Sequence, residues 1–248
     1  MLAAMSLLPM AATAPALDAS PASRRLTFVL VHGGWHGGWC WKKLTPLLAA
    51  AGHAVHTPTL TGLGDRAHLL TSDVDLSTHI EDVGALLFYE DLHDVVLVGH
   101  SYGGMVIAGV APLVAPRLAR VIYLDAFLPE DGKALEDYIE RPPTPEGISR
   151  LPPPGTAPRW GVTDKSDVTW MEARLGDQPA RTFTQAVHIA TDVSSRVPHS
   201  YVQCTKLPQL MEAAGRAKQR GFRYRTLFSA GHDAMISQPA QLARLLLE

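Results

Sequence analysis

The sequence has little cysteine and no surplus of basic charge. Only Cys40 and Cys204 occur among the 248 residues. Two cysteines exclude a disulfide-rich scaffold and a cysteine-rich zinc site, and we expect both to be buried thiols. The 22 Lys and Arg residues are offset by 24 Asp and Glu residues, so the formal net charge is −2. A nucleic-acid-binding protein would show a basic surplus, so we expect no nucleic-acid partner.

The sequence also lacks a hydrophobic run of membrane-spanning length. Residues 1–25 are rich in Ala, Leu and Pro, but this stretch is short and is broken by Pro9. No basic residue precedes its apolar part, as a secretory signal would require. We expect residues 1–25 to be a disordered or signal-like extension and the protein to have no membrane partner. The expected location is cytoplasmic, or secreted or periplasmic if the extension is a signal remnant.

From Leu26 onward, short apolar runs alternate with amphipathic stretches. The apolar runs predict strands at residues 27–31, 54–60, 94–98, 121–124, 200–204 and 223–228. The amphipathic stretches predict helices at residues 39–51, 76–90, 103–110, 210–219 and 238–247, with Ser77 as an N-cap and Gly52 as a helix end. This alternation predicts an α/β fold with a mostly parallel sheet of about six strands and helices on both faces. Residues 128–198 do not follow this alternation. We expect them to form a small cap within one domain at 26–248.

A G-x-S-x-G pattern, Gly99-His100-Ser101-Tyr102-Gly103, directly follows a predicted buried strand and precedes a predicted helix. This context is typical of a nucleophile elbow, in which a tight turn exposes a serine hydroxyl above the sheet. A serine needs a base to take its proton, and in this architecture the base comes late in the chain. His232 lies between the last predicted strand and the last predicted helix, so we expect it to be the base. Most other histidines are expected to be polar loop or surface groups. His100 is expected to point away from Ser101 as a packing or hydrogen-bonding residue, and His32 and His36 to shape the first glycine-rich loop.

An acyl-transfer site also needs two backbone N–H groups that face the developing oxyanion. The residue after the nucleophile, Tyr102, is expected to supply one. The loop after the first strand, His32-Gly33-Gly34-Trp35, is expected to supply the other from Gly34.

These motifs resemble those of the α/β-hydrolases. The resemblance is carried by residues 28–41 (FVLVHGGWHGGWCW), the Gly-His-Ser-Tyr-Gly-Gly elbow and the Gly-His-Asp-Ala-Met segment near the end of the chain. The group most similar to this pattern comprises small plant methylesterases and hydroxynitrile lyases with their bacterial esterase relatives. The resemblance implies a Ser-His-Asp enzyme with a small cap, no cofactor and no metal.

The acid departs from that group's pattern. Those enzymes place an aspartate shortly after the next-to-last strand, but Leu207 stands there in this sequence, beside Lys206. Asp125 instead ends an earlier strand, where the plant enzymes more often have a small apolar residue. We therefore predict that Asp125 is the acid of the triad. Asp233 and Glu212 are weaker alternatives.

The predicted function is hydrolysis of a carboxylic ester of a small, apolar or aromatic substrate through an acyl-enzyme. Aromatic residues near the motifs, Trp35, Phe127 and Trp160, are the expected lining of the substrate pocket. The alternatives are a hydroxynitrile lyase, a carbamate or amide hydrolase, and a ligand-binding protein on the same fold. The lyase is disfavoured because the related lyases carry a threonine and a lysine where this sequence has Gly33 and Asp233.

Overall fold

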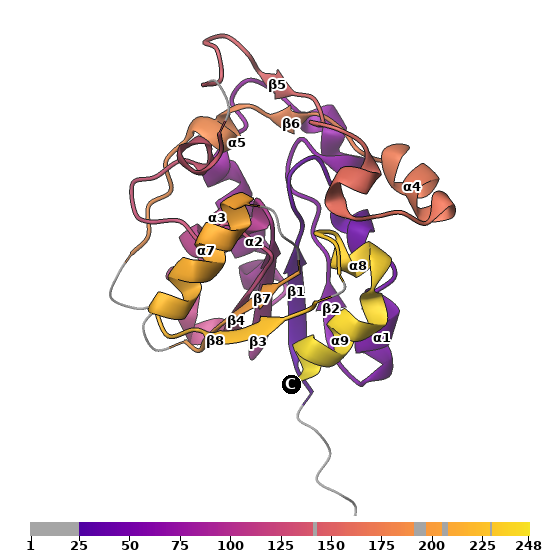
Figure 1. Ribbon diagram of the computed structural model, residues 1–248. Coiled ribbons are helices and arrows are strands. Elements are labelled where there is room, and N and C mark those ends of the chain that lie inside the picture. The colour runs from indigo at the N-terminus through magenta and orange to yellow at the C-terminus, as the bar shows by residue number, and fades with distance from the viewer. Residues whose placement is uncertain (1–24, 141–142, 191–196, 205–207, 229) are drawn as a thin grey trace, which may run out of the picture.

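A six-stranded parallel sheet forms the centre of the computed structural model (Figure 1), which describes residues 25–140, 143–190, 197–204, 208–228 and 230–248. The strand order is β2-β1-β3-β4-β7-β8. The strands are β1 (Thr27–Val31), β2 (Ala54–His56), β3 (Val95–His100), β4 (Leu118–Leu124), β7 (His199–Gln203) and β8 (Arg223–Thr226). The predicted α/β fold with a six-stranded sheet is confirmed. The predicted extension at residues 1–25 lies, except for Arg25, outside the described residues.

Helices cover both faces of the sheet. One layer holds α1 (Thr45–Ala50) and α9 (Pro239–Leu247), with the short α8 (Ala234–Ser237) beside them. The other layer holds α2 (Leu76–Tyr89), α3 (Gly103–Val110) and α7 (Pro208–Gln219). Successive side chains of a strand point to opposite faces, so a central strand packs against both helix layers.

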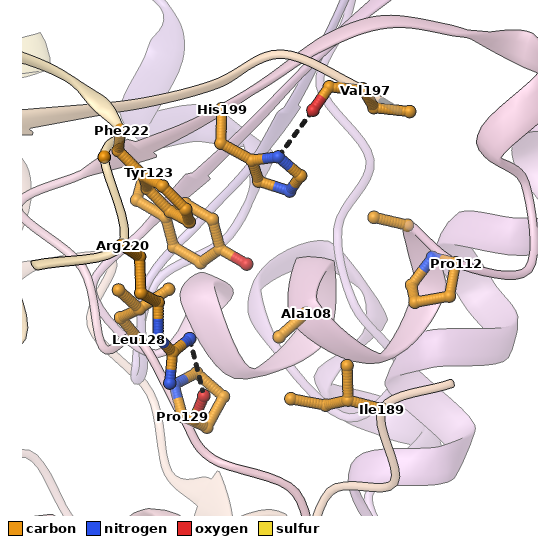
Figure 2. A pocket seen from close by; sticks show the side chains of 12 residues that line it. Ala108, Pro112, Tyr123, Leu128, Pro129, Ile189, Val197, His199, Arg220 and Phe222 are labelled. Atoms are coloured by element: carbon orange, nitrogen blue, oxygen red, sulfur yellow. Dashed lines mark hydrogen bonds between the residues drawn. The ribbon is translucent and has the colours of Figure 1, made fainter. Parts of the chain in front are cut away.

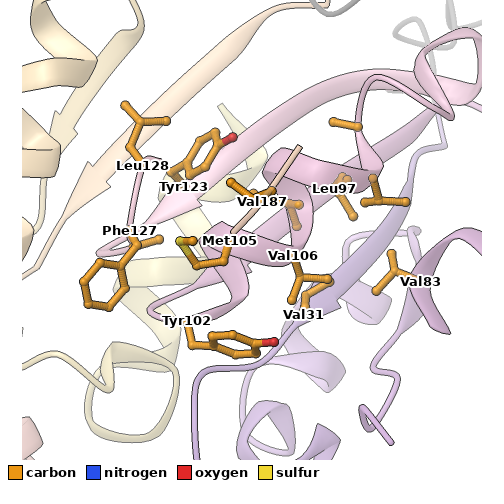
Figure 3. Packing of buried hydrophobic residues seen from close by; sticks show 14 of the residues in the cluster. Val31, Val83, Leu97, Tyr102, Met105, Val106, Tyr123, Phe127, Leu128 and Val187 are labelled. Atoms are coloured by element: carbon orange, nitrogen blue, oxygen red, sulfur yellow. The ribbon is translucent and has the colours of Figure 1, made fainter. Parts of the chain in front are cut away.

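The central strands therefore carry apolar side chains on both faces. Val29 and Val31 of β1 pack in the cluster with α2 and α3, part of which Figure 3 shows. Phe28 and Leu30 of the same strand pack in the cluster with α1 and α9. Burial on both faces explains the continuous apolar runs in the sequence.

Several predicted boundaries are wrong for local reasons. The predicted helix at 39–51 is two elements, a 3₁₀ turn over Gly38–Trp41 and α1, because Pro46 favours a fresh helix start. The predicted strand at 54–60 ends at His56, since Pro58 cannot donate to a strand ladder. Gly52 follows the C-cap of α1 with a φ of +91°, as predicted.

The predicted N-cap of α2 is also wrong. Asp75 caps this helix by accepting the N–H of Thr78, and the Thr78 side chain faces the Asp75 N–H in return. The N–H of Ser77 is instead donated to the side chain of Gln185 at 2.8 Å.

The chain between β4 and β7 carries the small elements that lie above the carboxyl edge of the sheet in Figure 1. They include α4 (Lys165–Glu172), α5 (Arg181–Thr184) and an antiparallel pair, β5 (Arg150–Leu151) with β6 (Gln178–Pro179). We call the part of this chain between Leu128 and Pro198 the cap. None of the helices that the structure describes has both the length and the apolar character to cross a membrane.

The strand order places a crevice at one point of the carboxyl edge. From β1 the chain goes outward to β2 and then returns to β3 on the other side of β1. The loops that leave β1 and β3 therefore diverge, and ligands of open α/β sheets bind at such a switch point. Ser101 follows β3 directly and Gly33 follows β1 by two residues.

Candidate active site

Ser101 sits on a strained turn between β3 and α3. Its φ is +53°, a conformation that residues with a Cβ rarely adopt. The flanking glycines make the turn possible, because a Cβ on Gly99 would lie 2.6 Å from the carbonyl oxygen of Gly103. A Cβ on Gly103 would lie 2.8 Å from the carbonyl oxygen of Val31. The G-x-S-x-G pattern thus reflects close backbone approach on both sides of Ser101.

Asp125 and His232 are hydrogen-bonded to each other next to this turn. Oδ2 of Asp125 lies 2.7 Å from Nδ1 of His232, and both side chains are buried. The other carboxylate oxygen of Asp125 accepts the N–H of Cys204 at 3.0 Å. Of the two weaker candidate acids, Glu212 is exposed on α7 and Asp233 is hydrogen-bonded to His36. Lys206 and Leu207 lie outside the described residues.

A cavity of about 430 Å³ opens above Ser101 and His232. Its walls are mainly apolar and aromatic, with Trp35 packed against Phe183 at a ring separation of 5.4 Å. Glu140 and Arg159 place one acidic and one basic side chain at its border. The cavity brings together six of the residues singled out from the sequence, namely Ser101, His232, Tyr102, Trp35, Phe127 and Trp160. Sequence reasoning missed Leu135, Ile139, Leu151 and Phe183, which come from the cap and had no motif to mark them.

The loop after β1 lies against the nucleophile. A Cβ on Gly33 would be 3.0 Å from Cβ of Ser101, so the backbone of residues 33 and 34 passes beside the serine. The N–H of Trp35 is already donated to Oε1 of Gln178 at 2.9 Å. The Trp35 N–H is thus already used, so Gly34 rather than Trp35 remains the predicted donor on this loop. Gln178 is fully buried, and it is another residue that no sequence motif indicated.

Comparison with known proteins decides the family. Residues 28–245 match the alpha/beta hydrolase family. The chain belongs to this family. This hydrolase is 38% identical to the carbendazim hydrolyzing esterase of Nocardioides sp. over 243 residues, which cover 88% of the chain and 97% of that enzyme. It is 27% identical to the polyneuridine aldehyde esterase of Rauvolfia serpentina over 268 aligned positions, covering 93% and 98% of the two chains.

Solved structures show the same fold. The methylesterase MES16 from Arabidopsis superimposes on 90% of this hydrolase and 97% of its own chain, with a TM-score of 0.74 and 28% identity. An extracellular α/β-hydrolase from a Paenibacillus species covers 90% and 98% of the two chains with a TM-score of 0.76 at 23% identity. The predicted resemblance to methylesterases and their bacterial esterase relatives is confirmed.

The expectation of a polar loop or surface group is wrong for His79, which is fully buried on α2. In this hydrolase His100 is packed and hydrogen-bonded, and His32 and His36 lie in the loop after β1, as expected. His32, His36, His79 and His100 are buried around the site. Burial lowers the pKa of His32 and of His100 to about 3 and that of His79 to about 4, so all three are neutral at pH 7. Their ring nitrogens hold backbone and side-chain groups in place, except that Nδ1 of His100 has no hydrogen-bond partner among the described residues.

Each neutral ring supports a different part of the site. Nδ1 of His32 faces the carbonyl oxygen of Gly33 at 2.8 Å, while its Nε2 accepts the N–H of Leu60. Nε2 of His79 donates to the carbonyl oxygen of Thr61, so its Nδ1 accepts the hydroxyl proton of Tyr102 at 2.8 Å. Nε2 of His100 faces the carbonyl oxygen of His232 at 3.1 Å.

Among the described residues, His100, His232 and Asp233 are the group whose potential metal-ligand atoms lie within 4.8 Å of one another. All three side chains are already hydrogen-bonded to other protein groups, as described for His232 with Asp125 and for Asp233 with His36.

A second cavity of about 470 Å³ lies on the α3 and α7 side of the sheet (Figure 2). Tyr123, His199, Arg220 and Phe222 gather there, and Phe222 stacks on His199 at a ring separation of 4.9 Å. The residues that line it are all different from those around Ser101. The two cavities are therefore separate sites.

Both cysteines are free and buried, as predicted. Burial raises the pKa of each thiol well above its ordinary value. Neither Cys40 nor Cys204 is therefore a competing nucleophile.

Proposed function

We propose that this α/β-hydrolase is a serine carboxylesterase that cleaves an ester of a small, apolar or aromatic substrate through an acyl-enzyme. The observation that carries the proposal is the 2.7 Å hydrogen bond between Asp125 and His232, at a cavity that also exposes Ser101. The esterase relatives described above support the reaction class.

In the first half of the reaction, the Ser101 hydroxyl oxygen attacks the ester carbonyl carbon. Nε2 of His232 takes the hydroxyl proton, because Nδ1 is committed to Asp125. The carbonyl oxygen becomes an oxyanion that accepts the N–H groups of Gly34 and Tyr102. When the oxyanion collapses, the bond to the alcohol oxygen breaks and His232 returns the proton to that oxygen.

In the second half, water takes the place of the alcohol. His232 accepts a proton from the water as its oxygen attacks the acyl carbon, and then returns that proton to Ser101 as the acid leaves. Asp125 stays ionised and stabilises the imidazolium in both halves. No proton is gained or lost by the enzyme over the full cycle.

The cavity favours a planar, apolar acyl or alcohol group. Trp35, Trp160 and Phe183 provide flat walls, with ring separations of 6.4 Å and 5.4 Å from Trp35 to the other two. A volume of about 430 Å³ suits a small molecule rather than a polymer chain. Carbamates and amides are the second candidate substrates, since the same three side chains can attack them.

The lyase alternative has a steric argument against it. A Cβ on Gly33 would lie 2.9 Å from Nδ1 of His100, so a threonine there requires the histidine to move. Asp233 is an ionised carboxylate paired with His36, which would repel cyanide.

The experiment is a screen of purified wild-type protein and Ser101→Ala against nitrophenyl esters of increasing chain length, aryl esters, aryl carbamates and carbendazim. We expect the wild type to hydrolyse short or aromatic esters and the variant to lose that activity. Equal, slow rates for the two proteins would contradict the proposal and favour a ligand-binding protein.

A further inference from the structure

A second buried acid–histidine pair lies beside the one that faces Ser101. Nε2 of His36 is 3.2 Å from Oδ2 of Asp233, and both side chains are buried. Nδ1 of His36 is 2.6 Å from the carbonyl oxygen of Gly34. A carbonyl oxygen and a carboxylate only accept hydrogen bonds, so both ring nitrogens of His36 must carry a proton. The ring is then an imidazolium facing an ionised Asp233.

The charges of this pair are mutually stabilising. Burial by itself lowers the pKa of His36, but the charge and hydrogen bond of Asp233 and the Gly34 carbonyl raise it above its ordinary value. Burial by itself raises the pKa of Asp233, but His36, with smaller effects of His100 and His232, brings it below its ordinary value. The other ionisable groups near the pair are His232, the neutral rings of His32 and His100, and the buried thiols of Cys40 and Cys204. Nε2 of His100 lies 3.5 Å from Oδ1 of Asp233.

The pair connects the two loops that carry the proposed chemistry. His36 belongs to the loop after β1, whose Gly34 is the proposed oxyanion donor. Asp233 directly follows His232 in the loop between β8 and α8. The two residues are 197 positions apart in sequence, so their contact fixes a tertiary relationship that neither loop fixes alone.

The cap contacts both of these loops. The N–H of Asp233 is donated to the carbonyl oxygen of Trp160 at 3.0 Å. Beside it, a Cβ on Gly161 would lie 2.4 Å from Cα of Gly231, so the cap backbone rests directly on the histidine loop. On the other loop, Trp35 donates its indole N–H to the carbonyl oxygen of Leu151 and accepts the N–H of Gly176. The cap thus contacts both loops, while His36 and Asp233 link them underneath.

We propose that His36 and Asp233 are positioning residues that hold the Gly34 N–H and the His232 imidazole at the separation the reaction needs. The inference rests on the proposed esterase function. Neither residue touches the reacting atoms. His36 acts through its hydrogen bond to the Gly34 carbonyl, and Asp233 acts through the adjacent His232. Small displacements matter here, since oxyanion donors and a general base contribute fully only in a narrow geometry.

The test uses Asp233→Asn, which keeps the shape of the side chain and removes its charge. We expect kcat for the best nitrophenyl ester to fall at least about tenfold while KM changes less than about twofold, because positioning of the donor and base matters mainly in the transition state. Asp167→Asn is the matched control, since Asp167 pairs with Lys43 on the exposed surface and should leave both constants unchanged. A change in kcat of less than about twofold for Asp233→Asn would overturn the inference.

His36→Gln and the double variant separate positioning from a general loss of stability. If the pair works as a unit, the double variant should lose about as much kcat as either single variant. Independent, multiplicative losses would contradict a joint role. Thermal unfolding of each variant ensures that rates are compared on folded protein only.

A spectroscopic measurement keeps the test independent of the esterase proposal. In the wild type labelled with ¹⁵N-histidine, both ring nitrogens of His36 should be protonated at pH 7, and Asp233→Asn should abolish this state. A singly protonated His36 in the wild type overturns the inference even if the protein is an esterase. Absence of any esterase activity in the wild type, with a doubly protonated His36, would instead refute the proposed function and with it the catalytic purpose of the pair.

Discussion

Oδ2 of Asp125 is hydrogen-bonded to Nδ1 of His232 at 2.7 Å, across 107 positions of sequence. Asp125 follows β4, which is the neighbour of the strand that ends at Ser101. The backbone at Asp125 has a φ of +39°, so its turn is strained as the serine turn is. Two adjacent strands, β3 and β4, are therefore each followed by a residue with a strained backbone, Ser101 and Asp125 respectively.

Asp125→Asn tests the role of this carboxylate. An asparagine is nearly the same size but cannot stabilise an imidazolium, and it favours the wrong tautomer of His232. We expect kcat for ester hydrolysis to fall by about 10⁴, as is typical when a triad acid is neutralised. The measurement is turnover of a nitrophenyl ester with folding monitored by circular dichroism, and a loss below about tenfold would contradict the assignment.

Gly33→Ala tests how closely the loop after β1 approaches the nucleophile. The added Cβ would lie 2.9 Å from Nδ1 of His100 and 3.0 Å from Cβ of Ser101. We expect overpacking of about 1–3 kcal/mol in urea unfolding. Displacement of Ser101 should also lower ester turnover by more than about tenfold.

Gly215→Ala is the matched control for that variant. Gly215 lies within α7, and a Cβ there would meet none of the described atoms within 4 Å. Because alanine favours a helix over glycine, we expect a gain of up to about 1 kcal/mol and unchanged turnover. Equal behaviour of the two variants would show that the loop is not packed against the serine.

Gln178→Leu tests the link between the cap and the loop after β1. The change leaves the Trp35 N–H without its acceptor in a buried place, and it removes the donor to Thr182. We expect a loss of about 1–3 kcal/mol in the free energy of unfolding. Gln185→Leu breaks a bond to Ser77 that water can replace, so its effect should stay within about 0.5 kcal/mol. A similar effect of the two changes would contradict the burial of the Gln178 contact.

The pH dependence of the free energy of unfolding should reveal the lowered pKa values of His32, His79 and His100. Their folded-state pKa values, about 3 for His32 and His100 and about 4 for His79, lie below the unfolded value of 6.5. As pH falls below 6.5, these histidines bind protons in the unfolded chain but not in the native protein, so stability is lost from pH 6.5 down to about 3. Near pH 5 the three groups together give a slope of about 4 kcal/mol per pH unit in the same direction.

Urea unfolding measured at several pH values checks this slope. His79→Gln removes one of the three groups, so its stability should fall less steeply with acid, by about a third. A variant with the same slope as the wild type would show that His79 is protonated in the native protein. His53→Gln is a suitable control, because His53 lies outside the buried cluster around the site.

Much of this arrangement can be predicted from the sequence because parallel sheets impose an order. A buried strand followed by Gly99-x-Ser101-x-Gly103 fixes where a nucleophile would lie, and the position of Asp125 at the end of a neighbouring strand predicts its contact with His232. The ends of helices and strands are harder to predict where a single proline breaks the element, as Pro46 and Pro58 do. Apolar residues resume after each proline, as Leu47 does after Pro46 and Leu60 after Pro58, and so extend the predicted element past the break.

The supporting contacts could not be predicted, because they join segments that no local pattern relates. His36 is part of a glycine-rich loop and Asp233 merely follows His232, yet only the folded chain brings them together. Gln178 lies in the cap, where the sequence lacks a period, and its role depends on the strained Trp35 turn with a φ of +63°. Burial of a polar side chain is a tertiary property, so composition alone assigns such residues to the surface.

The contact between Gly161 and Gly231 constrains how this enzyme can be recombined with its relatives. A Cβ on either residue would lie 2.4 Å from the Cα of the other, so neither position tolerates a side chain while the other backbone stays in place. A chimaera that takes its cap from another hydrolase must therefore bring a glycine at 161, or a histidine loop of different shape. The cap and the histidine loop therefore constrain each other, and we expect directed evolution of the cap to succeed most readily when both segments are varied in one library.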